Sequence, residues 1–167
     1  MERLLKLICA LCCLGLVISC DENLMDSGTK SFPSAEWSQD SPANFDIKPP
    51  DSITDYNIYL RLRNNQDYAY KNLWMITQMK FPQGKIVIDT LEYNMADAQG
   101  KFEGTGHDVI ENKLGYLKGF RFRESGTYQL SLQQAMRKSG SAIPLEQLSG
   151  VLDVGYSIEK QLQDGNK

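Results

Sequence analysis

A strict alternation of apolar and polar residues from Tyr56 to Arg63 constrains the fold of this chain more than any other feature. The apolar positions are Tyr56, Ile58, Leu60 and Leu62. Successive side chains of a β-strand point to opposite faces of a sheet, so this alternation predicts a strand with one buried face and one solvated face. Similar but less regular runs predict further strands at residues 45–47, 73–81, 86–95, 120–122, 128–132 and 152–158.

These runs predict an all-β protein. Turn residues such as Phe81-Pro82-Gln83-Gly84 separate them, and no segment carries an apolar stripe with helical spacing over a full helix length. About seven to eight strands with such turns indicate an antiparallel β-sandwich, either a jelly roll or an immunoglobulin-like fold. Two segments stay ambiguous, because residues 108–116 could form a helical turn and residues 145–148 a brief helix.

The N-terminal segment 1–19 has the pattern of a secretory signal peptide. Arg3 and Lys6 give it a positive start, and Leu7 to Ile18 is a run of 12 residues without a charge. A membrane-spanning helix needs about 20 apolar residues, so this run is too short to span. Small and apolar residues directly before Cys20 are typical of a bacterial lipobox. We therefore predict that Cys20 becomes lipidated with diacylglycerol and is the first residue of the mature chain.

The positions of the cysteines agree with this prediction. Cys9, Cys12 and Cys13 lie in the segment to be removed, so Cys20 would be the one cysteine of the mature chain and no internal disulfide could form. Residues 20–35, rich in serine and other turn residues, then predict a lipidated N-terminus and a flexible tether. Residues 36–160 should form the β-sandwich domain, and residues 161–167 should fray.

The charge of the chain favours some partners over others. A formal net charge of −3 argues against a nucleic-acid partner, which would require a basic face or stripe. The partner that we expect from the N-terminal pattern is a membrane, reached through the lipid on Cys20.

Residue patterns give no support for catalysis. His107 is the one histidine, whereas a catalytic zinc commonly takes two or three imidazoles. No Gly-x-Ser-x-Gly or phosphate-loop motif occurs. The carboxylates Asp89, Glu92, Asp97 and Glu103 could pair for glycoside hydrolysis, but acids at strand ends are more often solvated. We expect no enzyme, no metal and no cofactor.

A candidate binding surface comprises Trp74, Tyr68, Tyr70, Arg61 and Arg63. Aromatic side chains on a sheet face can stack against a sugar or hold a peptide, which makes a glycan- or peptide-binding lipoprotein the alternative function. The same aromatic residues can equally pack in the core or across strands, and the two arginines can pair across a strand face.

Four blocks of sequence resemble the GldH gliding-motility lipoproteins of Bacteroidetes. They are Arg61-Leu-Arg-Asn64 with Asp67-Tyr-Ala-Tyr-Lys-Asn-Leu-Trp74, then Asp89-Thr90 with Met95-Ala-Asp97 and Gly100 to Gly106, then Gly126-Thr-Tyr128 with Gln134-Ala-Met-Arg137, and finally Leu152 to Glu159. The resemblance implies an accessory lipoprotein of the gliding-motility and linked secretion machinery, without a known catalytic residue. It also implies that the partners are other envelope or motility-machinery proteins. We expect it in the cell envelope, in the outer rather than the inner membrane.

Overall fold

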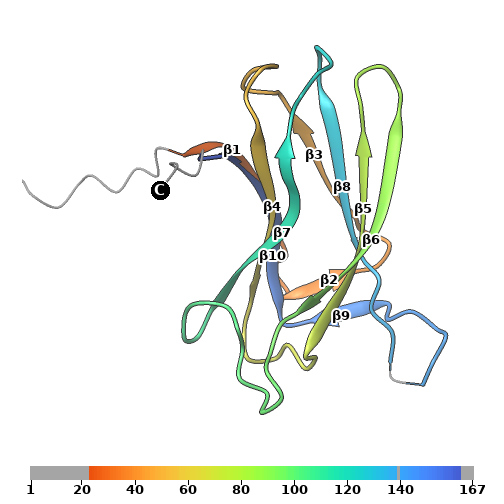
Figure 1. Cartoon of the computed structure of the whole chain (residues 1–167). Coiled ribbons are helices and arrows are strands. Elements are labelled where there is room, and N and C mark those ends of the chain that lie inside the picture. Colours follow the sequence, from red (N-terminus) through yellow and green to blue (C-terminus); the bar gives the residue numbers. More distant parts are fainter. Residues whose placement is uncertain (1–22, 139, 163–167) are drawn as a thin grey trace, which may run out of the picture.

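The computed structural model describes residues 23–138 and 140–162, and this part of the chain consists of strands and loops without a helix (Figure 1). Its ten strands are β1 (Leu24–Ser31), β2 (Glu36–Ser38), β3 (Ala43–Ile47), β4 (Tyr56–Asn64), β5 (Asn72–Lys80), β6 (Ile86–Asn94), β7 (Ile110–Phe120), β8 (Tyr128–Gln134), β9 (Gln147–Ser149) and β10 (Val151–Lys160). The all-β prediction is confirmed.

The strands pair in a nested order. β5 pairs with β6, β4 with β7, β3 with β8, β2 with β9 and β1 with β10, and every pair is antiparallel. The described chain is therefore one long antiparallel ribbon folded back at the β5–β6 turn. This ribbon is rolled up, because β4 also pairs with β10 and β5 also pairs with β8.

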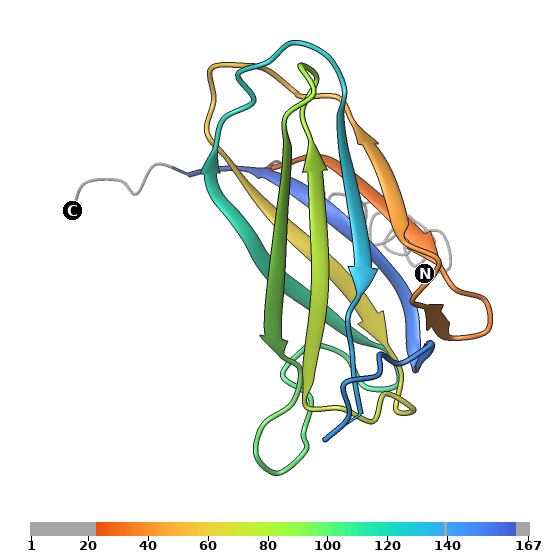
Figure 2. The same ribbon diagram turned by 90° about the vertical axis from the view of Figure 1, so that its right-hand side faces the viewer.

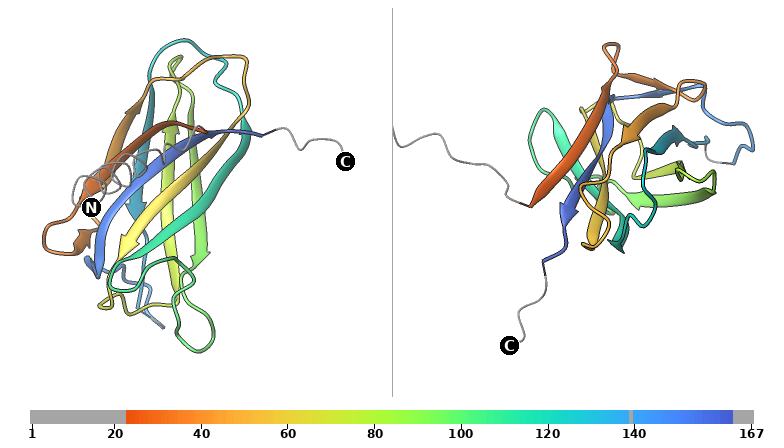
Figure 3. Two further views of the ribbon diagram at one scale, coloured as in Figure 1. Left: turned by 90° about the vertical axis from the view of Figure 1, so that its left-hand side faces the viewer. Right: turned by 90° about the horizontal axis from the view of Figure 1, so that it is seen from above.

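Rolling the ribbon creates two four-stranded sheets that face each other (Figures 2 and 3). One has the order β1-β10-β4-β7 and the other has the order β3-β8-β5-β6, while β2 and β9 form a small third sheet. In an immunoglobulin fold the first strand pairs with the second, whereas here the first pairs with the last. The sandwich is therefore a jelly roll, one of the two predicted types.

The inward-facing side chains of both large sheets form one core. Strand β4 alternates between buried and partly exposed positions along nearly its whole length, which confirms the prediction for this stretch. Its Ile58, Leu60 and Leu62 are fully buried, as are Leu73 and Met75 of β5. Exposed side chains lie on the two outer faces, and these outer faces carry the candidate sites.

Three local predictions differ from the structure. Residues 120–122 do not form a strand of their own, because Phe120 is the last residue of β7 and residues 121 and 122 lie in the loop that follows it. Residues 110–116 belong to strand β7 rather than to a helical turn, because Ile110, Asn112 and Leu114 alternate with exposed residues and are buried against β4. The segment around Leu148 is not a helix either. It forms β9, in which Leu148 lies opposite the fully buried Trp37 of β2.

The expected tether is the largest difference. Residues 24–31 form the edge strand β1, which is paired with β10. The inward-facing positions of β1 are filled by Asp26, Gly28 and Lys30, so an apolar alternation is missing from the sequence. Asp26 accepts a hydrogen bond of 2.9 Å from the Tyr156 hydroxyl, and the Lys30 ammonium donates to Ser41 Oγ at 3.0 Å. Polar contacts therefore dock this strand where core packing normally would.

Candidate functional site

The five residues of the predicted binding surface do not meet in one place. Arg61 and Arg63 lie on the outer face of the β1-β10-β4-β7 sheet. Tyr70 and Trp74 border a depression on the outer face of the other sheet. Tyr68 is only 3% exposed and belongs to the core. The structure therefore offers two separate surfaces on opposite sides of the sandwich.

Arg63 forms an ion pair across two neighbouring strands. It lies opposite Asp153 in the pairing of β4 with β10, and its Nε donates to Asp153 Oδ2 at 2.7 Å. A second guanidinium nitrogen lies 2.5 Å from the same oxygen. The hydrogen bond and the charge of Asp153 raise the pKa of Arg63. Because Asp153 is only 4% exposed, this arginine supplies the charge that compensates a nearly buried carboxylate.

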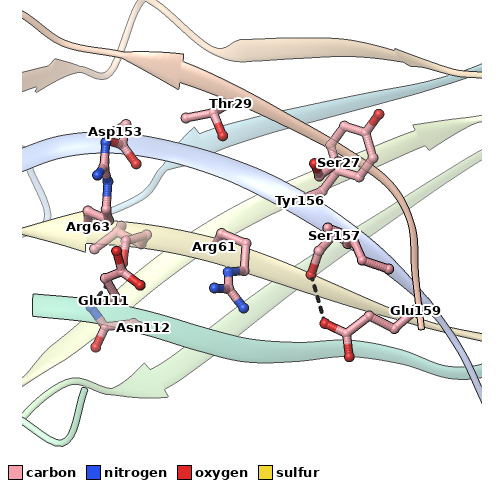
Figure 4. A pocket seen from close by; sticks show the side chains of 12 residues that line it. Ser27, Thr29, Arg61, Arg63, Glu111, Asn112, Asp153, Tyr156, Ser157 and Glu159 are labelled. Carbon is pink, nitrogen blue, oxygen red and sulfur yellow. Dashed lines mark hydrogen bonds and ion pairs between the residues drawn. The ribbon is translucent and has the colours of Figure 1, made fainter. Parts of the chain in front are cut away.

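Arg61 lies in the middle of a depression of about 300 Å³, bordered by residues of β1, β4, β7 and β10 (Figure 4). In strand pairing it lies opposite Gly155 on one side and Lys113 on the other. Gly155 has no side chain, which lowers the floor beside Arg61. Within residues 23–138 and 140–162, the Arg61 side chain has no hydrogen bond or ion pair. Its guanidinium is thus free to bind a group of another molecule.

Glu159, at the border of this depression, is held in place by an ion pair and a hydrogen bond. The Lys113 ammonium lies 2.6 Å from Glu159 Oε2 and 4.2 Å from the centre of the Tyr59 ring. The Ser157 hydroxyl donates to Glu159 Oε1 at 3.4 Å. These contacts fix the position of Glu159, while the Arg61 guanidinium beside it is available for recognition.

The second surface is a depression of about 680 Å³ over β5 and β6. Trp74 is 37% exposed there, next to Ile76 and Thr90, with Arg137 at the border. The Asn72 side chain donates to Glu92 Oε1 at 2.7 Å across the strand pair. An exposed indole beside polar groups can stack against a planar or sugar-like partner group.

Tyr68 has a structural role in place of a binding role. Its hydroxyl donates to the Asn72 carbonyl at 2.8 Å, and its ring contacts Tyr70 edge to face at 5.9 Å. Burial raises the pKa of Tyr68 well above the ordinary value of a phenol. A phenol held in this way stays protonated and keeps its bond to the backbone over the physiological pH range.

The residues considered for catalysis are dispersed. His107 is fully exposed on a loop, 3.8 Å from the equally exposed Asp108. Asp89 accepts a hydrogen bond from the Tyr116 hydroxyl at 3.3 Å, and Asp97 Oδ1 accepts from two backbone amides of its own turn. Among the described residues, no group of three or more His, Cys, Asp or Glu side chains could hold a metal ion.

The structure bears on membrane attachment in one respect. Across residues 23–138 and 140–162 there is no helix of sufficient length and hydrophobicity to pass through a bilayer. The predicted signal peptide and Cys20 lie outside the described residues.

Several members of the Arg61 depression were not predicted from the sequence. They are Asp153, Ser157 and Glu159 of β10 together with Glu111 of β7. A signal existed, because outward-facing polar positions alternate with core positions in both strands. Placing them beside Arg61 requires the pairing of β4 with both strands, and the sequence does not reveal this pairing.

Comparisons with known proteins support one family. A family-wide sequence model described as "GldH lipoprotein" matches residues 25–158. The "Gliding motility lipoprotein GldH homolog" of Christiangramia forsetii is 45% identical over 146 residues, which cover 87% of this chain and 89% of the relative. The "Gliding motility lipoprotein GldH" of Flavobacterium johnsoniae is 39% identical over 147 residues, which cover 87% of this chain and 91% of the relative.

A comparison of structures gives a weaker likeness. The chain resembles part of "Structure of infectious bursal disease virus Gx strain", with a TM-score of 0.34 and 16% identity. The match covers 92% of this chain and 37% of the viral chain. At this score the likeness carries no argument about this protein.

Proposed function

Because this chain belongs to the GldH lipoprotein family, we propose that it is a non-enzymatic accessory protein of the gliding-motility machinery and of the secretion machinery linked to it. The chain is a membrane-anchored lipoprotein of the cell envelope. In this proposal it holds partner proteins of the envelope at its outer sheet faces and transforms no substrate.

The observation that carries the proposal is the extent of the family match. Residues 25–158 run from the second residue of β1 to within two residues of the end of β10. The likeness therefore covers the whole rolled ribbon and is not confined to a short motif. The two outer faces described above belong to the matched region.

The arrangement of polar groups supports a role in binding. Charged side chains on the β1-β10-β4-β7 face form pairs, as Arg63 does with Asp153 and Lys113 does with Glu159. Acids that could have served in hydrolysis hold turns or strand pairs instead, such as Glu92 with Asn72. General acid–base catalysis needs a proton-transferring group in reach of a bound substrate. The guanidinium of Arg61 offers N–H donors and no acceptor, which suits it to binding.

We propose that Cys20 carries the anchoring lipid, and strand β1 then limits how far the domain can move from the membrane. Three residues separate Cys20 from Leu24, the first residue of β1. Four residue steps span at most about 14 Å. If residues 20–35 were all tether, the domain could lie about 50 Å away. The sandwich therefore stays close to the lipid headgroups, in our proposal those of the outer membrane.

Affinity capture from native membranes tests the proposed function. The tagged full-length chain should co-purify with proteins of the motility and secretion machinery from cross-linked outer membranes. Arg61→Glu and Trp74→Ser change one outer face each, so loss of a partner from one variant alone identifies the face that binds it. Retrieval of the same background proteins by all three chains, with no motility or secretion protein, would contradict the proposal.

A further inference from the structure

Strand β6 is an open edge of the sandwich. It pairs with β5 on one side, and its other side has no strand partner in the described chain. Figure 2 shows β6 at one border of the sheet that faces the viewer, with β3 at the opposite border. An edge strand presents unpaired backbone N–H and C=O groups, which can pair with another chain.

The other three edges carry features that discourage such pairing. The register of β1 shifts between Leu24 and Asp26, and the pairing of β7 with β4 shifts twice. β3 has only five residues and is soon followed by Pro49 and Pro50. Irregular register, short length and nearby proline are the usual means by which proteins protect sheet edges.

β6 has none of these features. Its nine residues pair with β5 without a register shift, and Ile86–Asn94 contains no proline, glycine or lysine. On its outer face, Ile86 is 51% exposed and Ile88 is 61% exposed. Asp89 and Glu92 place acids further along the strand, but Ile86, Val87 and Ile88 form a regular apolar edge, and such an edge promotes aggregation unless a specific partner covers it.

The sequence of this edge is complementary to itself. The segment is Lys85-Ile-Val-Ile-Asp89. When two copies of it pair antiparallel about Val87, each Lys85 lies opposite Asp89, each Ile86 lies opposite Ile88, and the two Val87 residues lie opposite each other. Directly opposed residues of an antiparallel pair share a face, so each opposition is a side-chain contact. An axis at Ile88 would instead place the Asp89 carboxylate opposite the Val87 side chain.

The two charged residues of this segment, Lys85 and Asp89, are placed so that each can pair with the opposite charge of a second copy. The Lys85 ammonium has no carboxylate partner among the described residues and lies 5.2 Å from the centre of the Phe81 ring. Asp89 is half-buried, and among the described residues its carboxylate has one weak hydrogen bond, at 3.3 Å, from the Tyr116 hydroxyl. Each could therefore add an ion pair with a second copy without breaking an existing one.

We propose that β6 pairs in antiparallel fashion with β6 of a second copy of this chain, about a two-fold axis at Val87. The two β3-β8-β5-β6 sheets then join into one continuous sheet. The pairing covers both copies of Ile86 and Ile88 and closes both open edges at once, as expected of a two-fold interface. This inference goes beyond the proposed function and does not depend on the lipid at Cys20.

Cysteine cross-linking of the full chain in its native membranes tests the axis. Opposed residues of an antiparallel pair have Cα atoms about 4.5–5.5 Å apart, within disulfide range. Val87→Cys should therefore give a disulfide-linked dimer on mild oxidation. Thr90→Cys is the matched control in the same strand, because the two copies of residue 90 would lie about 20 Å apart. The unaltered chain reports any linkage through its native cysteines.

The outcomes separate the possible occupants of the edge. A dimer with Val87→Cys and none with Thr90→Cys supports the proposal. No dimer with Val87→Cys, equal linkage with Thr90→Cys, or a mixed disulfide with a different protein would each overturn it.

Charge reversal provides a second, independent measurement. In sedimentation of the detergent-solubilised full chain, Lys85→Glu should weaken dimerisation by about tenfold or more, because like charges then oppose each other twice per dimer. Adding Asp89→Lys to Lys85→Glu should restore dimerisation, since the charges again match. A dimer that resists Lys85→Glu, or a double variant that stays monomeric while its circular dichroism is unchanged, would contradict the proposed pairing.

Discussion

At the scale of single residues, one outer face of the sandwich carries two arginines with different surroundings, two positions apart on the same strand. Arg63 compensates the nearly buried Asp153, whereas Arg61 has no partner within the described residues. The sequence pattern treats them alike, because both alternate outward from the core. Their neighbours on β10 distinguish a structural arginine from an available one.

Substitution of the two arginines should have unequal effects on stability. Arg63→Ala leaves the Asp153 carboxylate without its partner, so the free energy of unfolding should fall by about 1–3 kcal/mol. Arg61→Ala should change it by less than about 0.5 kcal/mol. Urea unfolding of both variants measures the difference. Equal effects would show that the Arg63–Asp153 pair does not stabilise the fold.

The raised pKa of the Tyr93 phenol predicts that the fold loses stability in alkali. Burial, with a smaller contribution from the charge of Tyr116, raises the pKa of Tyr93 to about 12, and its hydroxyl donates to the Gly115 carbonyl at 2.7 Å. A pKa raised on folding means that the folded state favours the protonated phenol. This contribution to stability is complete below pH 10 and is lost between pH 10 and 12.

Urea midpoints measured from pH 8 to 12 test this sign. The unaltered chain should lose stability above pH 10. Tyr93→Phe lacks the hydrogen bond and should be less stable at pH 8, but its midpoint should fall less steeply above pH 10. Parallel curves for the two chains would rule out Tyr93 as a source of the alkaline loss.

At the scale of elements, whether a strand could be predicted from the sequence depends on the elements that pack against it. β4 could be predicted from its alternation because both of its neighbours are strands and its inner positions are apolar. β1 could not, because an edge strand docked by Asp26 and Lys30 resembles a polar linker in sequence. The very short β2 and β9 were missed because three residues cannot show a period.

Gly28 provides a test that β1 is part of the sandwich. A Cβ atom at Gly28 would lie 2.6 Å from Cε1 of Tyr156 and 3.0 Å from Cδ1 of Phe45. Gly28→Val should therefore destabilise the domain by about 1–3 kcal/mol through overpacking. Thr29→Val is the matched control, since residue 29 is exposed on the same strand. If residues 24–31 were a free tether, both variants would unfold at the same urea concentration as the unaltered chain.

At the scale of the whole molecule, the nested pairing of the strands determines which residues meet on each face. It brings β1 against β10 and β4 between β10 and β7, which creates the Arg61 depression from strands distant in sequence. The sandwich class could be predicted from periodicity, but the choice of a jelly roll depends on which strands pair. The predicted binding surface was divided for the same reason, because Arg61 and Trp74 lie on strands of different sheets.

The position of β1 also limits the distance between the sandwich and the proposed anchor. β1 begins four residues after Cys20, so the start of the sandwich would stay within about 14 Å of Cys20 if that residue carries the lipid. The proposed attachment to the membrane therefore depends on Cys20 being the lipidated first residue of the mature protein. Cys20→Ala should abolish fatty-acid labelling and leave the precursor uncleaved, while Cys13→Ala should leave both unchanged.

Mass spectrometry of the N-terminal peptide from the membrane-bound protein tests this claim most directly. The account predicts a peptide that begins at Cys20 and carries the mass of a diacylglycerol on the sulfur. A peptide that continues unbroken from residue 19 into residue 20, or a mature chain whose Cys20 thiol is unmodified, would contradict it.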